Sequence, residues 1–173
     1  MRKQKGFSLI ELLIVVAIIL IIAAIAIPSL IRSKATANEA GGAATTRTLI
    51  TAAISYSNNF PAEGYPLNLT RLSPPAAGAQ VTLNNAGLVD NVLGCAGGGS
   101  CTKGSYQYTL TGINGGAAPQ TDFVAFATPV SQSAGNRDFV ATSDGVLRGQ
   151  TCPAAPPTAA IATVSAATAV NPT

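Results

Sequence analysis

The chain has 173 residues, which is room for one globular domain, and 47% of them are hydrophobic whereas only 10% are charged. A charged fraction this low points to contact with a membrane or to a tightly packed assembly, and the net charge of +3 comes without a basic patch for nucleic acid. His is absent, and no nucleophile–base pair, phosphate loop or metal-ligand cluster is visible, so we expect neither an enzyme nor a bound cofactor.

Residues 1–6 carry the excess positive charge. Arg2, Lys3 and Lys5 lie here, whereas the rest of the chain balances seven basic residues against seven acidic ones. Basic residues that precede an apolar segment favour a cytoplasmic N-terminus. This short segment therefore acts as a topology signal.

Residues 7–31, FSLIELLIVVAIILIIAAIAIPSLI, are predicted to form a transmembrane helix. Every residue from Leu12 to Ile27 is apolar, and roughly 20 helical residues cross a hydrocarbon core of about 30 Å. An ordinary secretory signal peptide is the alternative, since Ala24-Ile25-Ala26 resembles its small-residue cleavage site. Such a peptide has an apolar run of only about 7–15 residues, however, and here the helical pattern continues past Pro28.

Glu11 is an acidic residue inside this apolar segment. A carboxylate at membrane depth costs about 2.5 kcal/mol or more, and it usually marks a function or a buried partner. No other side chain in the segment can pair with Glu11. Its partner therefore comes from another molecule, or Glu11 is a harmless carboxylate at the membrane–water interface, and both interpretations stay open on this residue alone.

The run KGFSLIELLIVVAII, Lys5 to Ile19, resembles the class III signal of type IVa prepilins and related pseudopilins. The family pattern is a short basic leader that ends in Gly, here Gly6, followed by Phe7 and by a Glu at the fifth position after the cut, here Glu11. An unbroken apolar helix follows, with a Pro near its end that Pro28 matches. The match covers roughly residues 1–35.

The resemblance implies roles for four residues. A membrane prepilin peptidase would cleave between Gly6 and Phe7, removing residues 1–6 as a leader peptide, and would methylate the new amine to give N-methylphenylalanine. Glu11 would pair with the N-terminal amine of a neighbouring subunit, and this ion pair would offset the desolvation of both groups. Pro28, which removes one helical hydrogen bond, would be a site of local melting in the filament.

Residues 32–57 are predicted to continue the helix as its amphipathic half. Leu49, Ala53 and Tyr56 recur at helical spacing, so this face should pack on a sheet, and Asn58-Asn59 and Pro61 should end the helix. Gly41-Gly42 is a weak point, because each Gly costs a helix roughly 1 kcal/mol relative to Ala. We hypothesise that extension at this pair would let a filament stretch.

Residues 58–152 are predicted to form a globular head with an antiparallel sheet of three or four strands. A loop over residues 61–80 should contact the core, and residues 86–94 are predicted as a short helix. Strands are predicted at residues 105–110, 123–128 (the more buried strand) and 139–142, the last leading through a Gly turn into residues 146–148.

The fold class is therefore α+β: a long N-terminal helix packed on the sheet, as in the pilin fold. The loop residues expected at the core are Tyr65, Leu67, Leu69 and Leu72.

The chain has three Cys, and an exported location would permit disulfides. Three pairings are possible. Cys95–Cys101 is favoured because the pair encloses a short Gly-rich loop, AGGGS, that closes easily. Cys152 would then pair across subunits or stay reduced.

Residues 153–173 are predicted to be a surface tail, partly disordered. They are mostly Ala, Pro and Thr and carry no charge, so we do not expect them to build a core. Their Ser and Thr residues make O-glycosylation a further hypothesis.

The resemblance implies a structural function: the major pilin of a type IVa pilus, an extracellular filament for adhesion, twitching motility and DNA uptake. The partners would be further copies of the chain in a helical homopolymer, the prepilin peptidase, the pilus assembly platform and its motor ATPases. Before assembly the chain would lie in the inner membrane as a single-pass protein with a cytoplasmic N-terminus. After assembly it would lie in the pilus on the cell surface.

Two related functions remain open, a pseudopilin of a type II secretion system and a minor pilin. Many major pseudopilins carry an acidic calcium-binding loop and lack Cys. In this chain Asp138 and Asp144 are too few and too dispersed for such a loop. A membrane-tethered enzyme would belong to a different class, and the isolated carboxylates of the head argue against it.

Overall fold

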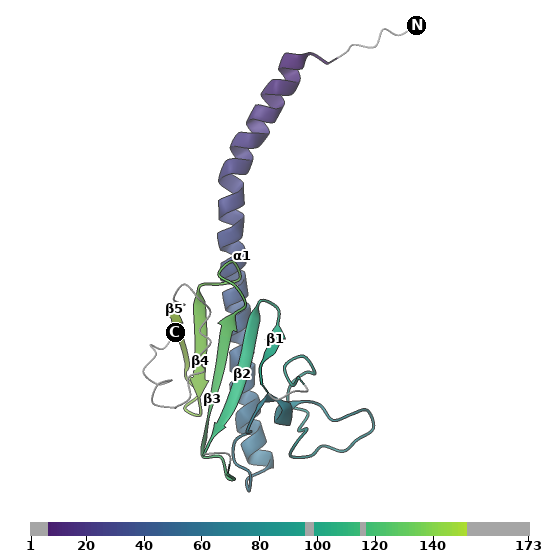
Figure 1. The fold of residues 1–173 in the computed structure, drawn as a ribbon, viewed down its shortest axis with the longest axis vertical. Coiled ribbons are helices and arrows are strands. Elements are labelled where there is room, and N and C mark those ends of the chain that lie inside the picture. The colour runs from purple at the N-terminus through teal and green to yellow at the C-terminus, as the bar shows by residue number, and fades with distance from the viewer. Residues whose placement is uncertain (1–6, 96–98, 115–116, 152–173) are drawn as a thin grey trace. The chain divides into compact units, whose positions relative to one another are not determined.

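The structure is a computed structural model that describes residues 7–95, 99–114 and 117–151. The chain divides into two compact units, Met1–Lys34 and Ala35–Thr173. The helix α1 (Leu9–Asn59, 51 residues) contributes to both units (Figure 1). The predicted leader, Cys152 and the predicted tail lie outside the described residues.

The first unit contains the apolar part of α1. By length and composition this part can cross a membrane, although a signal sequence would pass the same test. Its large apolar side chains are exposed throughout, from Leu9 at 81% to Ile31 at 54%. The helix is unbroken at Pro28. A ring without an N–H at this position leaves one helical hydrogen bond unmade but does not end the helix.

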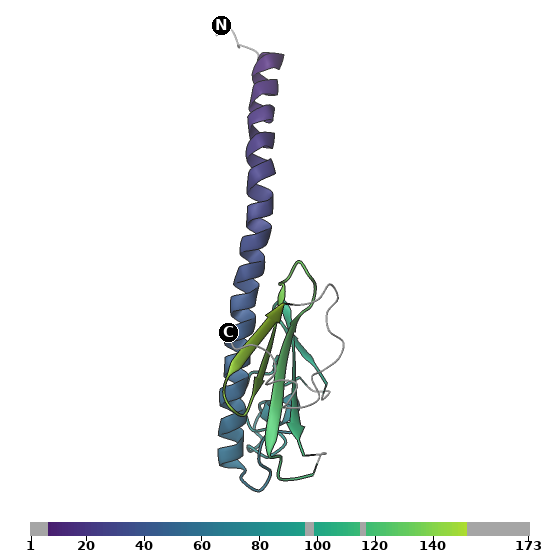
Figure 2. The ribbon, with the colours of Figure 1, turned by 90° about the vertical axis from the view of Figure 1, so that its left-hand side faces the viewer.

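The second unit is a two-layer structure, in which the later part of α1 lies along one face of a sheet (Figure 2). In the part of the chain that the structure describes, five antiparallel strands follow one another in chain order across the sheet. They are β1 (Cys101–Lys103), β2 (Tyr106–Ile113), β3 (Asp122–Pro129), β4 (Arg137–Thr142) and β5 (Leu147–Thr151).

The core lies between α1 and the sheet, as the helical spacing predicted. Leu49, Ala53 and Tyr56 are fully buried on α1. On β2 the side chains alternate strictly, so Tyr106 and Tyr108 point into the core while the residues between them stay partly or fully exposed. This period of two places one face of the sheet against the helix and the other away from it.

The connection after α1 is held by a short polar network and by a 3-10 helix, η1 (Leu69–Leu72). Arg71 donates to Glu63 at 2.6 Å and to the Tyr56 hydroxyl at 3.2 Å. Leu69 and Leu72 of η1 are buried, as expected for residues that contact the core. Of the other two residues expected there, Tyr65 packs on the core, whereas Leu67 is only half-buried.

The predicted α+β class is confirmed, with two corrections to its details. Within the described residues the sheet has five strands where three or four were predicted, because β1 is a three-residue strand with no apolar alternation to indicate it. Residues 86–94 do not form a helix. Gly87 has φ +66, a left-handed conformation that an α-helix cannot contain, and only residues 91–94 make a single turn.

Candidate functional site

The start of α1 brings together Ser8 and Glu11. Ser8 immediately precedes the first helical residue, Leu9. The Ser8 backbone N–H donates a hydrogen bond to Oε2 of Glu11 at 3.1 Å. The pattern Ser8-Leu9-Ile10-Glu11 is a capping box, in which the acidic side chain three residues on satisfies a backbone donor that the helix leaves unpaired.

This contact changes the physical account of Glu11. In the first turn a carboxylate also interacts favourably with the positive end of the helix dipole, typically by about 0.3–1 kcal/mol. Glu11 thus has a partner inside its own chain, a possibility that the sequence interpretation overlooked. The signal S-x-x-E ahead of an apolar run was present and would have revealed it.

The residues around Glu11 form a continuous apolar surface. Phe7 is 88% exposed, and the large apolar side chains of the next six helical turns are all more than two-fifths exposed. Glu11 is the only charged residue between Phe7 and Ile31. Such a surface is stable only when a bilayer or other protein covers it. Of the predicted processing residues, Phe7 lies at the start of this surface, and Gly6 lies outside the described residues.

Gly41 and Gly42 have different surroundings although they are adjacent in α1. A Cβ on Gly42 would lie 3.0 Å from two ring carbons of Tyr106, so Gly42 lets β2 approach the helix closely. A Cβ on Gly41 would meet nothing within 4 Å. Gly41 instead faces a shallow groove of about 210 Å³, lined mainly by small and polar residues of α1 and of the β1–β2 turn.

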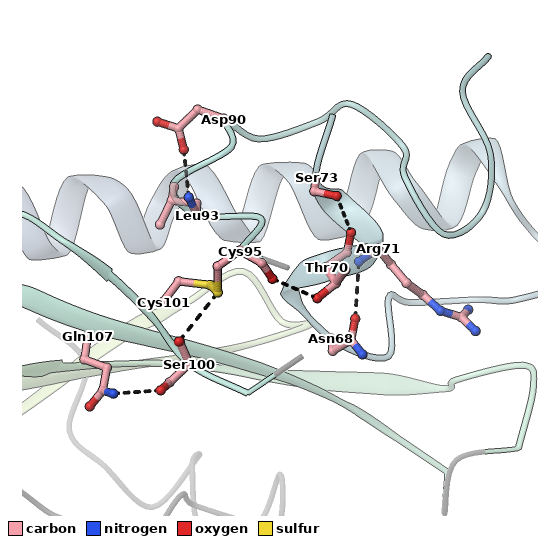
Figure 3. Close-up of a disulfide and its surroundings, with 10 residues drawn as sticks. All are labelled: Asn68, Thr70, Arg71, Ser73, Asp90, Leu93, Cys95, Ser100, Cys101 and Gln107. Atoms are coloured by element: carbon pink, nitrogen blue, oxygen red, sulfur yellow. Dashed lines mark hydrogen bonds between the residues drawn. A yellow bond between two sulfur atoms is a disulfide. The ribbon is translucent and has the colours of Figure 1, made fainter. Parts of the chain in front are cut away.

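Cys95 and Cys101 form a disulfide, the pairing that the sequence favoured (Figure 3). Their Cα atoms lie 5.8 Å apart, and Cys101, the first residue of β1, is buried. The Cys95 carbonyl also accepts a hydrogen bond from the Thr70 hydroxyl at 3.1 Å. The disulfide therefore joins the edge strand β1 to the segment that packs beside η1, which is a structural role.

The described carboxylates of the second unit serve structural contacts. The Lys103 ammonium lies 2.6 Å from Asp90 and holds the pKa of that carboxyl below its ordinary value. Arg148 pairs with Asp144, and together with hydrogen bonds from Thr142 and Val146 it lowers the pKa of Asp144 to about 2. Among the described residues no group of three or more His, Cys, Asp or Glu could hold a metal ion. The first ion pair links the loop at Asp90 to β1, and the second closes the turn between β4 and β5.

Comparison with known proteins identifies the N-terminal segment. A family model described as the prokaryotic N-terminal methylation motif matches residues 1–27. The chain is 59% identical over 39 residues to the type IV wide pilus major component PilA4 of Thermus thermophilus. That stretch is 22% of this chain and spans only 30% of the length of this curated relative. No solved structure matches. The resemblance of the chain to type IV pilins, first drawn from its N-terminal residues, is thereby confirmed.

Proposed function

We propose that this chain is a type IVa prepilin and that residues 7–173 are the major structural subunit of a pilus. The observation that carries the proposal is the start of α1. A wholly exposed apolar helix surface carries one carboxylate in its first turn, within a segment that matches the N-terminal methylation motif. The relative whose name describes a major pilus component supports the same assignment.

Processing would begin at the membrane. Residues 1–6 would keep the N-terminus on the cytoplasmic side while residues 7–31 span the bilayer. A prepilin peptidase would then cleave after Gly6 and methylate the amine of Phe7. Residues 32–57 and 58–152 would remain outside as the amphipathic half of the helix and the globular head, followed by the tail at 153–173.

Cleavage gives Glu11 a stronger partner than its present one. In the structure its carboxylate accepts from a neutral backbone N–H at 3.1 Å. A cationic donor adds a Coulomb attraction between two unit charges to the hydrogen bond, about 4 kcal/mol at 4 Å for an effective dielectric constant of 20. The cationic Phe7 amine of a neighbouring subunit would therefore compete well with the Ser8 N–H. This exchange would fix the register of subunits, while the apolar surface of α1 supplies most of the attraction.

Assembly would transfer the apolar helix from the bilayer into the filament core. The partners would be other copies of the chain, the assembly platform and the motor ATPases, and Pro28 would be a site where α1 melts locally. The finished filament would lie on the cell surface and serve adhesion, twitching motility and DNA uptake.

The test is electron microscopy of filaments sheared from cells, combined with mass spectrometry of their N-terminal peptide. We expect abundant thin fibres composed of this chain, with a peptide that begins at methylated Phe7. A mature chain that begins after Ala26 would refute the proposal, because the polymerising helix would have been discarded as a signal peptide.

The same experiment separates the two related functions. A pseudopilin would show the methylated Phe7 in the membrane fraction without abundant surface fibres. A minor pilin would make up only a small fraction of the subunits in the fibres. Either result would leave the processing site in place and would reject the assignment as a major pilin.

A further inference from the structure

Charged residues stand at both ends of the apolar part of α1, and none lies between them. Within residues 7–38 only Glu11, Arg32 and Lys34 carry a charge. The uncharged run from Leu12 to Ile31 is about 30 Å long at 1.5 Å per helical residue, which equals the thickness of the hydrocarbon core of a typical bilayer. When this run fills the core, the charged residues therefore fall at its two boundaries.

This spacing places Glu11 at one boundary of the core and not in its middle. The carboxylate accepts from the Ser8 N–H at 3.1 Å, and at the boundary its other lone pairs would reach water. The cost of a charge is high only at membrane depth. In the bilayer Glu11 therefore needs no partner from another molecule, and pairing with a second copy belongs to the filament.

Arg32 and Lys34 lie at the other boundary, on nearly opposite faces of α1. They are two residues apart, which is about 200° around a helix of 3.6 residues per turn. Both are exposed, and Lys34 forms no ion pair with any residue in the part of the chain that the structure describes. The apolar stems of such side chains lie along the helix while the cations reach the interface, where phosphate oxygens accept charge-assisted hydrogen bonds.

We propose that Arg32 and Lys34 bind phospholipid phosphates and thereby set the depth of α1 in the bilayer. A cation on each side holds the helix at this depth whichever way it turns about its axis. Cleavage after Gly6 would remove the basic residues at the opposite boundary, so Arg32 and Lys34 would then be the only basic side chains that hold the mature subunit. The inference rests on the proposed function, because it concerns the membrane stage of a precursor.

Loss of these two charges would leave the depth of α1 poorly defined. The next charged residue is Glu39, so the uncharged run would extend from Leu12 to Asn38, about 40 Å. A run that is longer than the hydrocarbon core tilts or slides within it. We therefore expect Arg32→Gln/Lys34→Gln to insert normally but to take a different depth.

Fluorescence quenching in vesicles measures the depth. The chain has no Trp, so Ile22→Trp places a single fluorophore at the middle of the run from Leu12 to Ile31. The full chain is reconstituted in phosphatidylcholine and phosphatidylglycerol, with lipids brominated at different positions along their chains. We expect the Trp near the centre of the bilayer and a displacement of about 3–5 Å, two to three helical residues, in Arg32→Gln/Lys34→Gln.

The matched control is Arg47→Gln/Lys103→Gln, which removes two positive charges from the second unit and should leave the depth unchanged. Unchanged depth in Arg32→Gln/Lys34→Gln would overturn the proposal. A Trp far from the centre in the chain that keeps all its basic residues would instead contradict the transmembrane span, and with it the proposed function. The two failures are thus distinguishable.

Solid-state NMR identifies the partner of Lys34 in the same vesicles. Lipid ³¹P dephases the ¹⁵N signal of any lysine ammonium group that lies against a phosphate. We expect Lys34→Gln to remove one dephased ammonium group and Lys103→Gln to remove none, since Lys103 pairs with Asp90. If Lys34 bound a carboxylate of a second copy instead, its substitution would leave the ³¹P dephasing unaltered, and that result would refute the proposal.

Discussion

Glu11 has one physical role in the structure, and the proposed filament would give it a second. Within the chain it caps the first turn of α1 through the Ser8 N–H. In the proposed filament it would meet a cationic amine in an apolar core, where loss of one partner costs about 3–5 kcal/mol because a charge is left buried without compensation. The two roles use the same carboxylate, so they can be separated only by substitutions that keep one and remove the other.

The first prediction therefore compares Glu11→Ala with Glu11→Gln. Gln is as suitable as Glu in a capping box but carries no charge. We expect both variants to insert into the membrane at normal levels and both to lose most or all filaments, since neither can form the ion pair. Immunoblotting of membranes and electron microscopy of sheared fibres measure the two properties.

The Gln variant decides between the roles. Filaments at normal abundance in Glu11→Gln, together with their loss in Glu11→Ala, would show that capping is sufficient and would reject the ion-pair mechanism. Ser8→Ala is the control. It removes the Ser8 hydroxyl but keeps both the backbone N–H that donates to Glu11 and the Glu11 charge, so we expect this variant to assemble filaments.

The second prediction concerns Gly41 and Gly42, two identical residues in unlike surroundings. Gly41→Ala should stabilise the second unit by about 0.5–1 kcal/mol, because Ala restricts the unfolded chain and its methyl group meets nothing within 4 Å. Gly42→Ala should destabilise it by about 1–2 kcal/mol, because its Cβ would press on the Tyr106 ring. Tyr106 cannot easily yield, since it is 1% exposed and its hydroxyl donates to the Arg137 carbonyl at 2.8 Å.

Urea unfolding of the two variants measures this difference directly. Opposite changes in the unfolding midpoint are expected, with little change in the slope of the unfolding free energy against urea. Equal effects at both positions would mean that helix propensity alone matters and that the Tyr106 contact is not a constraint.

At the scale of elements, the hairpin of β4 and β5 depends on a charged turn. Asp144 accepts from the Thr142 hydroxyl at 2.7 Å and from the Val146 N–H at 3.0 Å, and it pairs with Arg148. The Arg148 guanidinium is the first cause of the lowered pKa of Asp144, about 2 against the ordinary value of 3.8. A carboxyl with a lower pKa in the folded state stabilises the fold when it is ionised.

The third prediction follows because the pKa of Asp144 is lower in the folded state than its ordinary value. The contribution of Asp144 should be complete above its ordinary pKa of 3.8 and should be lost as the pH falls toward about 2. Because the side chain is 36% exposed, solvent screening limits the contribution to about 1 kcal/mol. Asp144→Asn should lower the unfolding free energy by that amount at neutral pH. The unfolding free energy of this variant should also decrease less between neutral pH and acid pH than that of the unaltered chain.

Unfolding by urea at neutral pH and near pH 3 provides the measurement. Glu63→Gln serves as a comparison, since Glu63 belongs to a different ion pair, with Arg71. If the unfolding free energy of Asp144→Asn decreased in acid by as much as that of the unaltered chain, the charged turn would make no contribution to stability.

The elements that sequence predicted well are those with a strong period. Leu49, Ala53 and Tyr56 indicated the buried face of α1, and the alternation of Tyr106, Tyr108 and Leu110 indicated β2. The C-terminal end of α1 was also predictable, because Asn58-Asn59 and Pro61 favour an end there and the helix ends at Asn59.

Elements that depend on tertiary contacts could not be predicted from the sequence. β1 exists because its three residues pair with β2 and because Cys101 is buried and joined to Cys95. The helix predicted at residues 86–94 is absent: Gly87 has φ +66, and only residues 91–94 form a turn. The burial of β3 was predictable, since its run FVAFAT is nearly continuous in apolar residues, and every residue from Phe123 to Pro129 is buried.

At the scale of the whole molecule, the two compact units have opposite surfaces. Large apolar side chains are exposed all along the helical part of the first unit, whereas the second unit buries most of its apolar residues in a core of its own. A surface that is apolar over many helical turns drives association, and a buried core does not. Insertion and polymerisation should therefore be properties of the first unit alone.

The last prediction tests this division by removing residues 1–34. A chain that begins at Ala35 should be soluble without detergent and monomeric at micromolar concentration, and it should unfold in one cooperative transition. The full chain is the control and should require detergent. Sedimentation velocity measures the mass, and circular dichroism during heating measures the transition. Stable oligomers of the shortened chain would locate part of the polymer contact on the sheet unit, and they would contradict an assembly held together chiefly by the apolar helix.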